Sequence, residues 1–246
     1  MNDVKVRRWS GAAGLAAIAL FFMEFPFYLV RGTFPPVTET LKLTEFAARN
    51  ATNIMICVFW DFLILTMVTV FAAGLQDLIR RADPRMEWIG ILFFGVSLVY
   101  VTLTLIADSL QAATVVDALT PPADGSILRS LWESAYLMYG SVALFLMAVM
   151  MAVAGYAGVA SGALPSFTGW IGYAGALSCL AFVPSMFVKH VDPSGFYNPA
   201  GWGPTAIASG FPLAVWMISD SIIMLRMSGP AMGGTREPSF HGRDQA

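Results

Sequence analysis

Three acidic residues lie inside long apolar stretches of the sequence, where an ionised carboxylate is costly. Glu24 lies in FFMEFPFY, Asp61 in CVFWDFLIL and Asp220 in VWMISDSIIM. A charged side chain that faces lipid at the centre of a bilayer costs about 2.5–3.5 kcal/mol or more. We therefore expect all three carboxyls to face a protein interior, where they are protonated, hydrogen-bonded or paired. There they can bind a ligand, transfer protons, or only form hydrogen bonds that hold neighbouring helices together.

Glu24 and Asp61 are predicted to line one pocket. The two apolar stretches that carry them are consecutive and are expected to form a helical hairpin, so these residues approach each other between the outer boundary and the middle of the membrane. Trp60 or Trp216 is expected to line the same pocket. Asp220 falls roughly 5–10 Å deeper, at 1.5 Å of rise per residue. These five residues form the candidate ligand-binding cavity.

Three prolines lie within the apolar stretches, at positions 26, 184 and 212. Each removes a backbone hydrogen bond from its helix, and the freed carbonyl needs a partner inside a membrane. All three fall in the predicted outer half, which favours a cavity that opens outward beneath the loop of residues 189–205. Ordinary helix kinking is the alternative, and it is the more common reason for such prolines.

Several kinds of chemistry are excluded by the residues present. The two histidines are His190 and His241, the second in the C-terminal tail, so the helices cannot supply the ligands of a bis-histidine haem. No metal-binding or phosphate-binding motif occurs, and no lysine lies inside an apolar stretch to form a Schiff base. Cys57 and Cys179 lie in apolar runs and are expected to be packing residues. We predict no metal site and no cofactor.

Composition places the chain in the membrane class. Hydrophobic residues make up 57% of the 246 residues and charged residues 12%, against about a quarter charged in soluble domains. The sequence predicts an all-α, polytopic six-helix bundle over residues 1–227 and a disordered cytoplasmic tail over 228–246. The predicted spans are residues 9–30, 51–74, 88–108, 133–158, 169–188 and 206–226. The bilayer is the expected partner, and nucleic acid is not, because no concentrated basic face occurs.

Lysine and arginine set the expected orientation. Nine of them fall on the side that holds both termini and the Arg80–Arg85 turn, and five on the other side. The positive-inside rule then places both termini in the cytoplasm and the protein in the inner (plasma) membrane as a multi-pass protein.

The segments between the spans are predicted to lie near water. Residues 31–50 are expected to include a short surface helix, and residues 109–132 to form a loop with turns at Thr120-Pro121-Pro122 and Asp124-Gly125. Asp108 and Glu133 are expected to be solvated at helix ends. Tryptophans 9, 88 and 170 are expected at the inner headgroup level, and tryptophans 132 and 202 near the outer face.

A Trp-x-Gly pattern begins three of the predicted helices, at Trp9, Trp88 and Trp170. It suggests three helical hairpin repeats, although interfacial tryptophan and frequent glycine explain it as well. The opening RRWSGAAGLAAIAL, the arginine-rich turn and GALPSFTGWIGYAGAL resemble a family of small bacterial six-helix membrane proteins catalogued as a domain of unknown function. That resemblance implies the fold over residues 7–226 and no activity.

Three functions fit these features. The first is binding or transport of a small or lipidic molecule through an outward-facing acidic cavity. The second is a membrane-embedded acid–base enzyme of isomerase or cyclase type on an apolar substrate. Membrane-bound terpene cyclases resemble this chain weakly, with acids that would fall on Trp60-Asp61 and Asp220, but they usually have seven helices. The third is a structural or accessory subunit.

Overall fold

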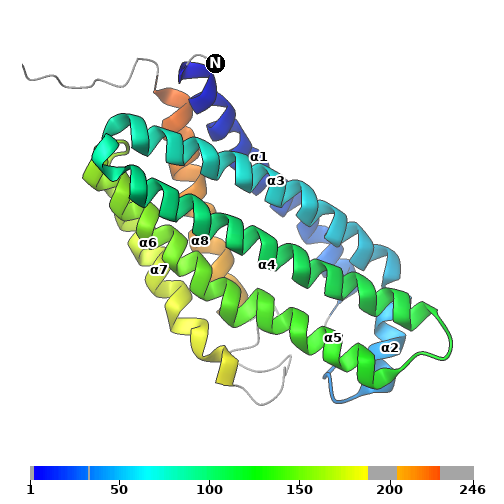
Figure 1. Ribbon diagram of the computed structural model, residues 1–246. Helices are drawn as coiled ribbons and strands as arrows, with labels where there is room; N and C mark the ends of the chain where they lie inside the picture. Colours follow the sequence, from blue (N-terminus) through cyan, green and yellow to red (C-terminus); the bar gives the residue numbers. More distant parts are fainter. Residues whose placement is uncertain (1–2, 33, 188–203, 228–246) are drawn as a thin grey trace, which may run out of the picture.

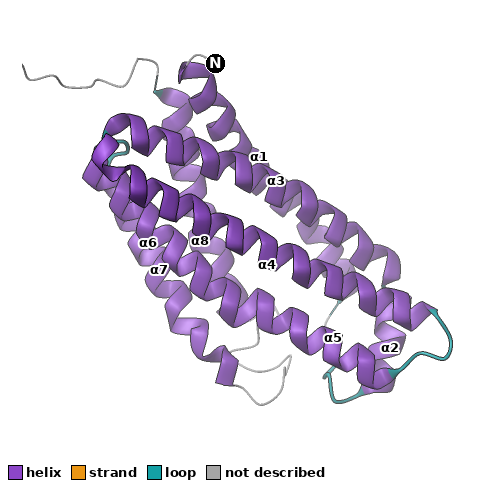
Figure 2. Ribbon diagram, in the orientation of Figure 1, coloured by secondary structure: helices purple, strands orange, loops and turns teal. Residues whose placement is uncertain are grey.

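The computed structural model describes residues 3–32, 34–187 and 204–227, and every regular element in these ranges is helical (Figure 2). The helices are α1 (Asp3–Arg31), α2 (Thr40–Arg49), α3 (Ala51–Ala82), α4 (Glu87–Leu119), α5 (Gly125–Leu137), α6 (Ala143–Ser161), α7 (Ser166–Phe182) and α8 (Pro204–Arg226). A π-helical turn, Met138–Val142, joins α5 to α6, and 3₁₀ turns precede α4 (Pro84–Met86) and follow α7 (Val183–Phe187).

Six of these helices form a closed ring. Contacts run from α1 to α3, α4, α6, α7 and α8 in turn, and α8 closes the ring against α1. In Figure 1 the long helices α1, α3 and α4 lie side by side along one direction, with α8 behind them. The main hydrophobic core fills this ring with leucine, isoleucine, valine, methionine and phenylalanine side chains.

Five stretches in the described part of the chain are long and apolar enough to cross a membrane. They are Val4–Arg31, Ala51–Ala82, Pro84–Leu119, Gly125–Ser161 and Ser166–Phe187. These correspond to the first five predicted spans. The sixth predicted span, 206–226, coincides with α8, which is not among the five. With five such stretches and no strand in the described ranges, the architecture is that of a helical multi-pass membrane protein.

Three of the stretches exceed the length that a bilayer requires by the largest margin. They contain 32, 36 and 37 residues, against about 20 for a hydrocarbon core of roughly 30 Å. Their extra turns meet α2 at one end of the bundle, at the lower right of Figure 1. We call this region the end cap. It has its own hydrophobic core, formed by Phe34, Val37, Leu43, Phe46, Ala47, Ile54, Val115, Leu128, Trp132 and Tyr136.

The end cap corrects the prediction that residues 109–132 form a loop. The turn lies at Thr120–Asp124, as the proline and glycine signals indicate, but α4 continues to Leu119 and α5 begins at Gly125. The two helices extend this far because their apolar residues pack in the end cap. Val115 and Leu128 are both buried in its core. In residues 31–50, α2 confirms the predicted short helix, and its Leu43 is also buried in the cap.

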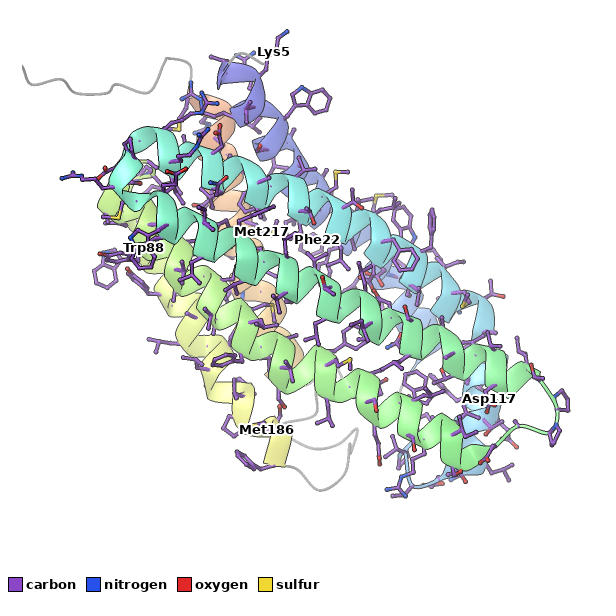
Figure 3. All side chains as sticks on the ribbon, in the orientation of Figure 1. Lys5, Phe22, Trp88, Asp117, Met186 and Met217 are labelled. Carbon is purple, nitrogen blue, oxygen red and sulfur yellow. The ribbon has the colours of Figure 1, made fainter. Side chains whose placement is uncertain are left out.

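Trp132 was predicted near the outer headgroups, and this prediction is wrong. Its side chain is 0% exposed, because it packs between Phe34, with ring centroids 4.5 Å apart, and Tyr136, stacked at 5.3 Å. In contrast, Trp9, Trp88 and Trp170 are 65–70% exposed. Trp88 projects from the bundle in Figure 3. Trp202 lies outside the described residues.

Asp124 caps the N-terminus of α5. Its Oδ1 accepts a hydrogen bond from the Ser126 backbone N–H at 2.8 Å and from the Ser126 hydroxyl at 2.7 Å. These hydrogen bonds lower the pKa of the Asp124 carboxyl below its ordinary value.

Replacing Asp124 with alanine is expected to speed amide hydrogen exchange in the first turn of α5, because the cap is lost. Asp124→Asn, which keeps a neutral capping oxygen, serves as the control and should exchange at a rate between those of the wild type and Asp124→Ala. A carboxyl with a lowered pKa stabilises the fold at neutral pH and loses this effect as the pH falls through that pKa. The difference between wild type and Asp124→Ala should therefore shrink below about pH 4. Equal exchange in all three proteins at pH 7 would contradict the assignment.

Candidate functional site

A cavity of about 270 Å³ lies inside the helix ring. Its walls come from α1, α3, α4, α6, α8 and the π-helical turn. Most of the lining is apolar, with alanine, isoleucine, leucine, valine and methionine side chains that include Met217, which points into the bundle in Figure 3. The polar lining residues are Glu24, Tyr28, Asp61, Tyr100, Thr104 and Tyr139.

The structure brings together two of the five candidate residues. Glu24 and Asp61 both line this cavity, whereas Trp60, Trp216 and Asp220 are not among its described lining residues. Trp216 is buried edge-on against Phe71 and Phe93 in the main core. Trp60 precedes Asp61 on α3, and one residue turns the helix by about 100°. It therefore points away from the wall that Asp61 joins.

Asp220 lies in a separate buried position. Its side chain is 0% exposed, and neither of its carboxyl oxygens has a hydrogen-bond partner among the described residues. Thr168 of α7 faces it, but the Thr168 hydroxyl donates to the Pro165 carbonyl at 3.0 Å. Asp220 is therefore a buried acid that does not belong to the cavity.

Glu24 is almost fully enclosed, at 1% exposure. Its carboxyl lies within hydrogen-bonding reach of the hydroxyl of Tyr28, one turn further along α1, and of the thiol of Cys57 on α3. Its Oε1 has no hydrogen-bond partner among the described residues. Helix α1 continues through Pro26 to Arg31, so the proline does not interrupt the wall. One oxygen of a buried carboxyl is thus left for a molecule inside the cavity.

Asp61 is paired with a second acid, Asp108 of α4. The two carboxyl groups lie within hydrogen-bonding reach of each other, and the Tyr139 hydroxyl donates to Asp108 Oδ1. Two carboxyl groups form a hydrogen bond when one of them carries a proton, because a carboxylate is only an acceptor. Asp61, Asp108 and Tyr139 therefore form one polar group, in which a proton shared between the two carboxyls would allow them to hydrogen-bond.

Asp108 was predicted to be solvated at a helix end, and this prediction is wrong. The side chain is 0% exposed. The predicted span ended at residue 108, whereas α4 runs on to Leu119, so Asp108 lies well inside the helix and faces the bundle. The other predicted acid, Glu133, pairs with Arg129 at 2.9 Å and remains partly exposed.

The π-helical turn positions Tyr139. The predicted span 133–158 was a continuous helix, but Gly140 has non-helical angles, φ −83° and ψ −106°, between α5 and α6. Such turns often occur at functional sites. The next residue, Ser141, hydrogen-bonds to Ser185 of the 3₁₀ turn that follows α7, with 2.8 Å between the hydroxyl oxygens. This bond ties the break to a neighbouring helix and fixes the position from which Tyr139 reaches Asp108.

Among the described residues, one basic side chain, that of Arg31, approaches the site. The Arg31 guanidinium lies over the ring of Tyr28, 4.6 Å from its centroid. Arg31 ends α1, less than two turns beyond Glu24. A long arginine side chain can bury its stem along the helix and carry its charge back toward the site.

Sequence reasoning missed Asp108, Tyr139, Tyr100, Thr104 and Tyr28. The sequence does contain a pattern that indicates three of these residues. Tyr100, Thr104 and Asp108 recur every four residues and so form one polar stripe on α4. Nothing in the sequence indicates that Tyr139 reaches this stripe, because that contact depends on the backbone break at Gly140.

Comparisons with known proteins give no match. No protein-family model, no curated protein and no solved structure matches the chain. The resemblance to a six-helix family of unknown function therefore stays a prediction.

Proposed function

We propose that the chain is a six-crossing inner-membrane (plasma membrane) protein that binds or transports a small apolar or lipidic molecule through an outward-facing acidic cavity. The observation that carries this proposal is the buried Glu24 carboxyl, whose unpartnered Oε1 belongs to a side chain that lines a 270 Å³ cavity together with Asp61. Ligand pockets combine mostly apolar walls with a few placed polar groups, and their volumes begin at about 300 Å³. The cavity has this character and suits a small ligand.

The proposed orientation, with both termini in the cytoplasm and α8 as the sixth crossing, rests on which helix ends lie together. Gly11 near the start of α1 packs against Ser221 and Leu225 near the end of α8, and Gly74 near the end of α3 packs against Ser10. Both described chain ends and the arginine-rich turn thus share one end of the bundle. Lysine and arginine are more numerous at this end than at the other, as the positive-inside rule requires of a cytoplasmic face. The cavity acids then belong to the outer half.

Ligand extraction tests the proposed function. Ala17 lines the cavity, and Ala19 is an exposed residue two positions along the same helix. The purified wild type and an Ala19→Leu control should release the same small molecule, identified by mass spectrometry. Ala17→Leu should fold but retain at least about tenfold less of it, because the added side chain occupies the cavity. Equal amounts from both variants, or no molecule from any preparation and no binding of added apolar ligands, would overturn the proposal.

A second function, acid–base catalysis on an apolar substrate, is favoured by the Asp61, Asp108 and Tyr139 group. A protonated carboxyl in an apolar pocket can donate a proton to an alkene or epoxide. Asp61→Asn separates the possibilities, because the amide keeps the shape but not the proton chemistry. Intact binding with lost turnover would indicate the enzyme, and a loss of stability alone would indicate a structural or accessory subunit.

A further inference from the structure

Acids outnumber bases around the cavity. Glu24 and Asp61 line it, and Asp108 lies within hydrogen-bonding reach of Asp61. Among the described residues, Arg31, over the ring of Tyr28, is the base that approaches them. An ionised acid in a region of low dielectric is expensive without a counter-ion, so a cationic group in the cavity would supply the positive charge that these side chains lack.

The position of that missing charge is marked by Glu24. The side chain is 1% exposed and lines the cavity, yet its Oε1 has no hydrogen-bond partner among the described residues. Buried carboxylate oxygens normally have a partner, because leaving one unpaired costs more than an unpaired neutral group. The unsatisfied oxygen thus gives the cavity an acceptor for a cationic group.

The remaining walls suit an organic cation with an apolar body. Tyr28, Tyr100 and Tyr139 line the cavity, and aromatic ring faces attract cations within about 6 Å. The ring of Tyr28 already holds the Arg31 guanidinium in this way. The aliphatic and methionine side chains of the other walls, such as Leu65 and Met147, accommodate an apolar body.

We propose that the cavity binds a monovalent organic cation with an apolar body, such as a quaternary or protonated amine, with Glu24 as its counter-ion. This inference rests on the proposed function and specifies its ligand class. The carboxylate and the aromatic faces recognise the charge, and the aliphatic walls recognise the body.

Binding of a matched pair of probes tests the proposal. Benzyltrimethylammonium and neopentylbenzene have nearly the same shape, but only the first carries a charge. Isothermal titration calorimetry on the detergent-solubilised full chain should show the cation binding at least about tenfold more tightly than the neutral probe. Glu24→Gln, which keeps the shape of the side chain, should abolish this preference. Asp220→Asn, which neutralises a buried acid outside the cavity, should leave it unchanged.

Three other outcomes would overturn the cation inference, and they differ in what they mean for the proposed function. If the neutral probe binds as tightly as the cation, and Glu24→Gln binds both like the wild type, the cation inference fails while the proposed apolar binding function stands. If neither probe binds and Ala17→Leu behaves like the wild type in ligand extraction, both fail. If Asp220→Asn removes the preference as strongly as Glu24→Gln, the effect is not local to the cavity and the inference is overturned.

Discussion

Replacing Gly172 with leucine is expected to prevent folding of the bundle. A Cβ at this position would lie 2.8 Å from the Met151 backbone carbonyl oxygen of α6. Backbone atoms inside a helix cannot move aside as a flexible side chain can. The same crossing brings Gly155 within a similarly short distance of Gly169, where a Cβ would lie 2.9 Å from the Gly169 carbonyl oxygen. Glycine is therefore required for α6 and α7 to pack this closely.

The expected loss exceeds about 3 kcal/mol, at the upper end of what overpacking costs. Gly95→Leu is the matched control, because it also lies within a helix and a Cβ there meets nothing within 4 Å. Size-exclusion chromatography and thermal unfolding in detergent should show a folded Gly95→Leu protein and an aggregated or absent Gly172→Leu protein. Similar yields and melting temperatures for the two variants would contradict the close packing of α6 on α7.

Trp132→Ala should cost about 3–5 kcal/mol, the usual range for removing a large buried aromatic side chain. Trp132 is 0% exposed and is among the largest fully buried side chains described. Its loss would leave Phe34, Phe46 and Tyr136 around a void in the end cap. The end cap should then open before the rest of the bundle, because it has a separate hydrophobic core.

Limited proteolysis and thermal unfolding measure this effect. Trp132→Ala should expose new cleavage sites near residues 120–124 and lower the melting temperature. Trp88→Ala is the control, because its ring is 65% exposed and should change neither result. Cleavage of Trp132→Ala at the wild-type rate would show that the end cap does not depend on this aromatic core.

The helical membrane class could be predicted from sequence because long apolar runs stand out in the composition. Two of the five candidate cavity residues could be predicted because the cost of charge in lipid acts on single residues. This cost alone requires Glu24 and Asp61 to face inward, and their adjacent helices bring them together. The prolines were a weaker guide, since α1 and α8 run on through Pro26 and Pro212. Pro184, in contrast, lies in the 3₁₀ turn that ends α7.

The end cap and the pairing of Asp61 with Asp108 could not be predicted, because both depend on contacts between distant segments. A turn signal such as Thr120-Pro121-Pro122 locates a chain reversal but does not show whether its flanks are helical. Extending the third predicted span to Leu119, where α4 ends, would have placed Asp108 inside a helix and not at its end. The contact between Asp108 and Tyr139 additionally needs the non-helical backbone of Gly140. The three hairpin repeats suggested by the Trp-x-Gly starts stay a prediction, to be tested by superposing α1–α3 on α7–α8.

Thiol labelling tests the outward-facing acidic cavity most directly. Thr104 lines the cavity and is 8% exposed, so a cysteine there is reachable only through it. In a Cys57→Ser background, Thr104→Cys should react with a small membrane-impermeant cationic methanethiosulfonate added outside right-side-out vesicles. The background protein should not react, because its remaining cysteine, Cys179, is buried, and benzyltrimethylammonium should slow the labelling. Labelling only from the cytoplasmic side, or only after denaturation, would contradict the account.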